Sequence, residues 1–165
     1  MAFFNPSTQL SNIGIWMSTR HIRLYFILFL TVPIIVNAQG DLTNQQPIIK
    51  SIQLGDKHNA LRFYPDQLTF ETGKVYKLII SNRSTQKHYF SANGMAHSVF
   101  TRKVQIVSSN QTLVEVKGTI SEIEVYPGAT AEWWFVPIKT ITASSLHCAI
   151  KGHREAGMVG KITIK

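Results

Sequence analysis

Residues 63–82 read FYPDQLTFETGKVYKLIISN, and this stretch sets the fold class. Its second half alternates in character, with Tyr76, Leu78 and Ile80 forming one wholly apolar face. Successive side chains of a strand point to opposite faces, so the pattern is that of a strand with one side against a core. The dipeptide Thr72-Gly73 separates this run from the one before it, as a turn between two strands does.

Similar runs rich in Ile, Val, Thr, Phe and Tyr recur along the chain, split by Gly, Pro, Asn and Asp. They predict strands over residues 48–54, 61–64, 67–71, 75–82, 104–107, 112–117, 122–126, 131–136, 145–149 and 161–165. Only residues 92–100 are expected to make a short helical excursion, and residues 91–110 have no expected role beyond covering the sandwich. The predicted fold is an all-β, Greek-key antiparallel β-sandwich, with Trp133, Trp134 and Phe135 in its core or on its sheet faces.

The composition fits one packed domain and excludes several classes. The chain has 165 residues, of which 44% are hydrophobic and 16% charged, so it is too apolar for a disordered protein. A single cysteine excludes an internal disulfide framework and a metal site built from several thiolates. The formal net charge is +8, but no nucleic-acid-binding module accompanies it. The positive charge is therefore expected on a solvated surface, where it could steer an acidic or membrane-bound partner.

The N-terminal part has the pattern of an export signal. Residues 24–36, LYFILFLTVPIIV, carry no charge, follow a basic segment and precede small residues. We expect residues 1–38 to be a signal peptide cleaved after Ala38, with Met17 as an alternative start. A retained anchor is the weaker interpretation, because a membrane-spanning helix needs about 20 apolar residues. Residues 39–46 would then be a flexible leader and residues 47–165 the domain, in a periplasmic or secreted protein.

The end of the chain carries the donor atoms. Residues 147–165 read HCAIKGHREAGMVGKITIK, in which four residues separate Cys148 from His153 and four more separate His153 from Met158. A glycine-rich loop between two strands can bring a thiolate, an imidazole and a thioether to one point. This soft set suits copper better than magnesium or calcium, and a thioether is a poor ligand for structural zinc.

A trigonal copper site needs a second imidazole from a distant part of the chain. His88 is the best candidate, because it follows the strand at 75–82 and a polar turn; His97 is the alternative. His147 would point to the opposite face from Cys148 on a strand, and His58 lies in a charged turn.

Residues 47–165 resemble the cupredoxins, and the loop from Cys148 onward is similar to the rusticyanin-type ligand loop of that family. The stretch at 63–82, with a Pro-containing strand, a Gly turn and an apolar strand ending in Asn, resembles the family too. The resemblance implies one type 1 copper per chain, with His88, Cys148 and His153 as equatorial ligands and Met158 as the long axial ligand. Tyr89 stands where many members have a small polar residue, so its backbone N–H is left to donate to the cysteine sulfur.

The expected function is that of an exported one-electron carrier cycling between Cu(I) and Cu(II), not an enzyme. His153 would be the electron gate, because small apolar residues surround it and suit transient docking of a redox protein to a monomer. The alternative is a copper carrier or chaperone that delivers metal to an oxidase, with Met95 and His97 as its access route. Copper enzymes commonly hold further copper through His-x-His pairs, and the sequence contains none.

Overall fold

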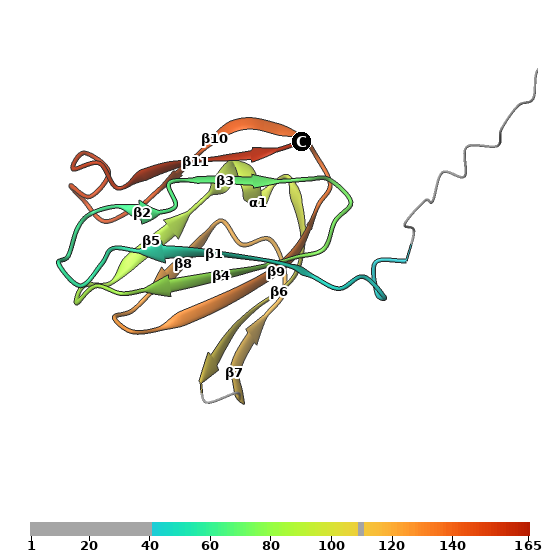
Figure 1. Ribbon diagram of the computed structural model, residues 1–165, viewed down its shortest axis with the longest axis horizontal. Coiled ribbons are helices and arrows are strands. Elements are labelled where there is room, and N and C mark those ends of the chain that lie inside the picture. Colours follow the sequence, from blue (N-terminus) through green and yellow to red (C-terminus); the bar gives the residue numbers. More distant parts are fainter. Residues whose placement is uncertain (1–40, 109–110) are drawn as a thin grey trace, which may run out of the picture. The chain divides into compact units, whose positions relative to one another are not determined.

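The structure, a computed structural model, describes residues 41–108 and 111–165, so the expected signal peptide lies outside the described residues. Two sheets make up the fold (Figure 1). The larger sheet has the order β2 (Phe63–Tyr64), β1 (Ile48–Leu54), β4 (Tyr76–Asn82), β9 (Thr130–Pro137), β6 (Val99–Ser108) and β7 (Gln111–Val116). The smaller sheet has the order β3 (Gln67–Phe70), β11 (Val159–Ile164), β10 (Ile141–His147), β5 (His88–Ser91) and β8 (Glu122–Val125). One short helix, α1 (Asn93–Ala96), joins β5 to β6.

The predicted β-sandwich is confirmed, but it is not antiparallel throughout. β1 pairs with β4 in parallel and β11 pairs with β3 in parallel, while the other ladders are antiparallel. The cause is the route of the chain, which leaves β1, passes through β2 and then β3 in the other sheet, and only then enters β4. A tight hairpin forces an antiparallel pair, whereas a crossover of this kind permits a parallel one.

The core lies between the sheets and follows the alternation seen in the sequence. Every second residue of β4 is buried, so the predicted apolar face of Tyr76, Leu78 and Ile80 is confirmed. Aromatic rings contact one another at its centre, and the ring of Phe70 lies edge-on to those of Tyr76 and Phe135 at 5.0 and 5.1 Å. Such pairs contribute about 0.5–1.5 kcal/mol beyond the area they bury.

Two adjacent tryptophans of β9 confirm that this strand has one side in the core. Trp133 is fully buried, and its indole N–H donates to the hydroxyl of Thr101. Trp134 points to the other face, where the ammonium groups of Lys77 and Lys103 lie 5.4 and 5.5 Å from its ring. Both tryptophans therefore have packing roles.

The sequence had suggested that the segment at 91–110 covers the sandwich, but this segment is part of the sandwich itself. It contains α1 and all of β6, which extends well beyond the predicted 104–107 and pairs with β9 inside the larger sheet. The short strand β5, with the sequence HYFS, also went unpredicted, because four residues between a turn and a helix show no periodicity. Within the described residues, no helix has the length and apolar character needed to cross a membrane.

Candidate metal centre

Three soft donors converge at one end of the sandwich. The donor atoms of His88, Cys148 and His153 all lie within 4.8 Å of one another. The Cys148 Sγ is 3.9 Å from the Nδ1 of His88 and 3.5 Å from the Nδ1 of His153. Among the described residues this is the one group of histidine, cysteine and acidic side chains spaced to hold a metal ion.

The pairing of two strands in the smaller sheet explains why residues 60 positions apart meet. β5 and β10 are antiparallel neighbours, with His147 opposite Ser91. The chain enters β5 at His88 and leaves β10 just before Cys148. Both residues are completely buried, so the sheet brings their side chains together inside the protein rather than on its surface.

A buried polar cluster holds the turn that leads into His88. The side-chain amide of Asn82 donates to the carbonyls of Gln86 at 2.7 Å and of Val125 at 2.8 Å. Its oxygen accepts from the backbone N–H and from the hydroxyl of Ser84, both at 2.9 Å. Asn82 is 1% exposed, so these bonds form without competition from water. The turn before His88 is thereby attached to both β4 and β8.

Gly55 packs against the ring of His88. A Cβ at this position would lie 3.0 Å from the His88 Nε2 and 2.9 Å from the Cβ of Ser84, and the φ angle of Gly55 is +62°. Both the space and the backbone conformation therefore require glycine. Gly55 carries no sequence signal for this role, because it meets His88 only in the folded chain.

The loop that follows β10 closes on itself through the backbone. The Cys148 N–H donates to the Met158 carbonyl at 3.2 Å, and the Met158 N–H donates to the His153 carbonyl at 2.9 Å. Gly152 and Gly157 adopt φ angles of +86° and +97°, which glycine reaches without strain. Met158 is fully buried at the start of β11, on the same loop as the other two donors.

The donor set and its spacing fit a copper ion. Metal bonds of about 2.3 Å to a thiolate and about 2.0 Å to an imidazole place sulfur and nitrogen about 3.5–3.7 Å apart, for angles between tetrahedral and trigonal. The separation of 3.5 Å from Cys148 Sγ to His153 Nδ1 lies in that range, and the 3.9 Å to His88 Nδ1 lies slightly above it. Two imidazoles and one thiolate with a nearby thioether are the ligands of a blue-copper site.

The state of His88 supports the same assignment. Its Nε2 is buried and has no hydrogen-bond partner within the described residues. Burial lowers the pKa of His88, and the charge on His153 lowers it further, so the neutral ring is favoured. A neutral imidazole whose Nδ1 faces the other donors is the form that binds a metal. The nitrogen without a hydrogen-bond partner, Nε2, faces Gly55, so Nδ1 is the His88 atom that is directed at the other donors.

The backbone also reaches the sulfur. The N–H of Tyr89 donates to the Cys148 Sγ at 3.3 Å, which is the bond expected when no small polar side chain stands at that position. A hydrogen bond to a ligating sulfur is one of the means by which a protein adjusts a copper site.

The other histidines and Met95 lie outside this cluster. His97 and His58 are exposed and belong to no metal-spaced group, so His97 does not replace His88. His147 is half-buried; burial lowers its pKa first, and the nearby Arg154 lowers it further. Met95 is fully buried in the hydrophobic core, so it does not form the access route that a copper chaperone would use.

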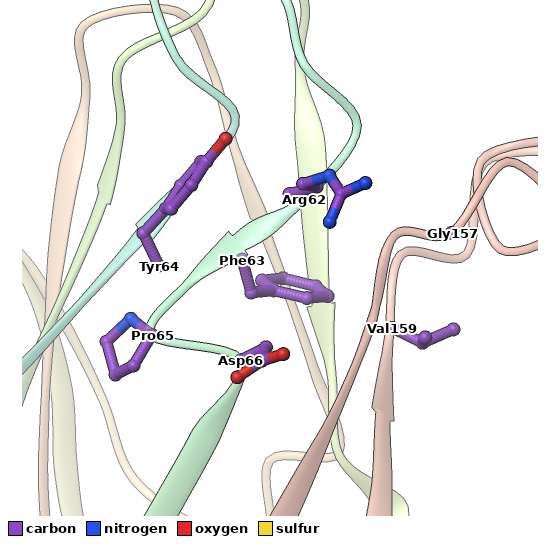
Figure 2. A pocket seen from close by; sticks show the side chains of 7 residues that line it. All are labelled: Arg62, Phe63, Tyr64, Pro65, Asp66, Gly157 and Val159. Atoms are coloured by element: carbon purple, nitrogen blue, oxygen red, sulfur yellow. The ribbon is translucent and has the colours of Figure 1, made fainter.

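The loop that carries His153 mixes small apolar and charged residues and borders a hollow. His153 is half-buried, and its loop also holds exposed Ala149, Ala156, Gly157 and Val159, half-buried Ile150 and the exposed charged residues Lys151, Arg154 and Glu155. A hollow of about 290 Å³ lies next to this loop (Figure 2). Its lining consists of Arg62, Phe63, Tyr64, Pro65 and Asp66 on one side and of Gly157 and Val159 on the other.

The structure is similar to copper proteins of known structure. It matches a multicopper oxidase from Campylobacter jejuni (19% identity, TM-score 0.50) and a Cu-containing nitrite reductase from Thermus scotoductus (13% identity, TM-score 0.54). Each match covers 73% of this chain, which spans only 31% of either enzyme. It also matches auracyanin A, a "blue" copper protein from Chloroflexus aurantiacus, over 73% of this chain and 100% of that one (16% identity, TM-score 0.47). No protein-family model and no curated protein matches the sequence.

The two matches of higher TM-score establish the cupredoxin-type fold, and the expected fold class is thereby confirmed. The chemistry of the site depends on the donor residues themselves, His88, Cys148 and His153.

Proposed function

We propose that the protein is a type 1 copper protein that carries single electrons. His88, Cys148 and His153 would hold one copper ion, with Met158 as the weak axial ligand. The ion would supply the redox chemistry by cycling between Cu(I) and Cu(II). The observation that carries this proposal is the position of the Cys148 Sγ, 3.9 and 3.5 Å from two imidazole nitrogens of separate chain segments.

The burial of the donors favours electron transfer over metal delivery. His88 and Cys148 are 0% exposed, so a metal bound there would exchange slowly with a partner protein. An electron needs only a short path to the surface, and the half-buried ring of His153 supplies one. The small apolar residues of its loop, which lie among charged ones, suit brief contact with a redox protein, for which interfaces below about 1,200 Å² are usual. This arrangement supports a carrier rather than a copper chaperone.

The described residues hold a single group of donors spaced for a metal ion. Copper enzymes commonly hold further copper, so this single group supports a carrier over an oxidase or reductase. The expected signal peptide, residues 1–38, supports export to the periplasm or the medium. N-terminal sequencing of the exported protein should begin at Gln39, and an intact N-terminus would refute this part of the proposal.

Absorption spectroscopy of the copper-loaded protein tests the ligand set. We expect an intense visible thiolate-to-copper band that disappears in Cys148→Ala and in His88→Ala. His97→Ala is the matched control, because it removes an exposed imidazole outside the cluster and should leave the band unchanged. The proposal fails if the wild-type protein shows no such band, and the assignment of His88 fails if only His97→Ala abolishes it.

A further inference from the structure

The larger sheet extends beyond the smaller one at one edge. It ends in β7, whereas the smaller sheet ends in β8, and all six residues of β7 are exposed. Three of them are large and apolar, with Leu113 59%, Val114 52% and Val116 46% exposed. Figure 1 shows β7 and the end of β6 projecting away from the remaining strands.

The uncovered side of β7 is the one that continues the core. In the β6–β7 ladder Val116 lies opposite Val104 and Val114 lies opposite Ile106. Val104 in turn lies opposite the buried Trp133 of β9, so these side chains share the inward face of the sheet. A groove of about 220 Å³ opens there, lined by Val104, Ile106, Val114, Val116, Ile120, Glu122 and Ile123. The inward face of β7 is therefore covered only in part, by Ile120 and the start of β8, and its valines stay exposed.

The outer edge of β7 is also unpaired within the described residues, since β6 is its one neighbour in the sheet. An edge strand presents unpaired backbone donors and acceptors, and proteins usually protect it with charges or cover it. β7 carries a single charged residue, Glu115, and Lys117 follows directly after the strand. An exposed apolar face and a free strand edge thus coincide at the same place.

We propose that β7 is a self-association surface, at which the β7 strands of two copies pair antiparallel about a two-fold axis. The larger sheets of the two copies would then join into one, and the apolar grooves would meet over the axis. Such an interface is isologous and closes at the dimer. The sequence led us to expect a monomer, and this proposal departs from that expectation. The inference does not depend on the metal centre.

The charges select the register of this pairing. In each possible register the two-fold axis passes through one residue, which lies opposite the same residue of the second copy. Registers centred on Val114, Glu115 or Val116 all keep the valines on the inward face, because cross-strand partners share a face. The register centred on Glu115 places the two Glu115 carboxylates opposite each other. The register centred on Val114 places Glu115 opposite Leu113 of the second copy. Only the register centred on Val116 opposes Glu115 to Lys117 of the second copy, twice per dimer. Opposite charges at directly opposed positions stabilise a strand pair, and like charges destabilise it.

Within one chain, Glu115 and Lys117 already lie close enough to form an ion pair. The carboxylate of Glu115 already lies 3.1 Å from the ammonium of Lys103 and 3.3 Å from that of Lys117. Strand alternation places Glu115 on the outward face, and the Lys117 side chain, which is 73% exposed, can pair with Glu115 of the second copy in place of its own.

Sedimentation equilibrium of the copper-loaded protein, purified after export, tests the proposal. The weight-average mass of the wild type should rise with concentration towards twice that of the monomer. Glu115→Lys and Lys117→Glu should each weaken association by about tenfold or more, since each opposes like charges in the dimer. An equimolar mixture of the two variants should associate again, because the lysine introduced at position 115 in one copy would face the glutamate introduced at position 117 in the other. Recovery on mixing also shows that both variants are folded.

Two matched controls separate this interface from general effects. Lys103→Met breaks the ion pair that Glu115 makes with Lys103 within the chain but leaves the dimer pairs intact, so it should still associate. Ile138→Lys places a charge at another exposed apolar residue, 66% exposed, and should also associate. A wild type that stays monomeric at every concentration overturns the proposal. So does an association that survives both single charge reversals, is not restored by mixing, or is lost in either control.

Discussion

Replacing Asn82 with alanine should reduce the free energy of unfolding by about 2 kcal/mol, at about 1 kcal/mol net for each hydrogen bond lost without compensation. The Asn82 side chain takes part in four hydrogen bonds, and it is only 1% exposed. The hydroxyl of Ser84 and the carbonyl of Gln86 keep each other as partners at 2.8 Å, which leaves the bonds to the Val125 carbonyl and from the Ser84 backbone N–H without compensation.

Urea denaturation of the metal-free protein measures this loss without a contribution from copper binding. Asn93→Ala is the control, because it removes an exposed asparagine at the start of α1 and should change stability by less than about 0.5 kcal/mol. Copper affinity should also fall in Asn82→Ala, since the turn that it holds leads into His88. A loss of unfolding free energy below about 1 kcal/mol would refute the view that this cluster secures the turn.

Three further predictions concern single positions. Gly55→Ala should displace the His88 ring and weaken copper binding, as measured by competition with a chelator, because its Cβ would lie 3.0 Å from the ring nitrogen; unchanged affinity would contradict this packing. Met158→Leu should keep the visible band but raise the reduction potential measured by voltammetry, since loss of a weak donor disfavours Cu(II); an unchanged potential would argue against an axial role. Burial acts to raise the pKa of Glu132, but hydrogen bonds from Gln105, Trp134 and Lys77 leave that pKa below its usual value. Wild type should therefore be more stable than Glu132→Gln above the unfolded pKa of about 4.3, and the difference should vanish as pH falls through the lowered folded pKa; a pH-independent difference in urea denaturation would refute this.

The parts of the structure that depend on local sequence were predictable. The strand predicted at 48–54 has the bounds of β1, because alternation and flanking turns are written in consecutive residues. The loop carrying Cys148, His153 and Met158 was identifiable for the same reason. Its donors lie within eleven residues, and glycines punctuate them.

The parts that depend on contacts between distant segments were not predictable. The parallel pairing of β1 with β4 depends on a route through the other sheet, which no local pattern encodes. Gly55 meets His88 only because β1 and β5 come together in the folded chain. The sequence favoured His88 over His97 because His88 follows a predicted strand. The helix α1 separates the two residues, and His88 is buried whereas His97 is exposed.

The two proposed imidazole ligands differ in a way that bears on how an electron would leave the site. The His88 ring is fully buried, with Gly55 against its Nε2 and Ser84 beside it, so it belongs to the interior of the sandwich. His153 lies in a glycine-flanked loop and is half-buried among small exposed residues. Backbone hydrogen bonds nevertheless join its segment to both Ile150 and Met158. A ligand that is accessible on one side gives an electron a shorter path to a partner than a fully buried ligand does.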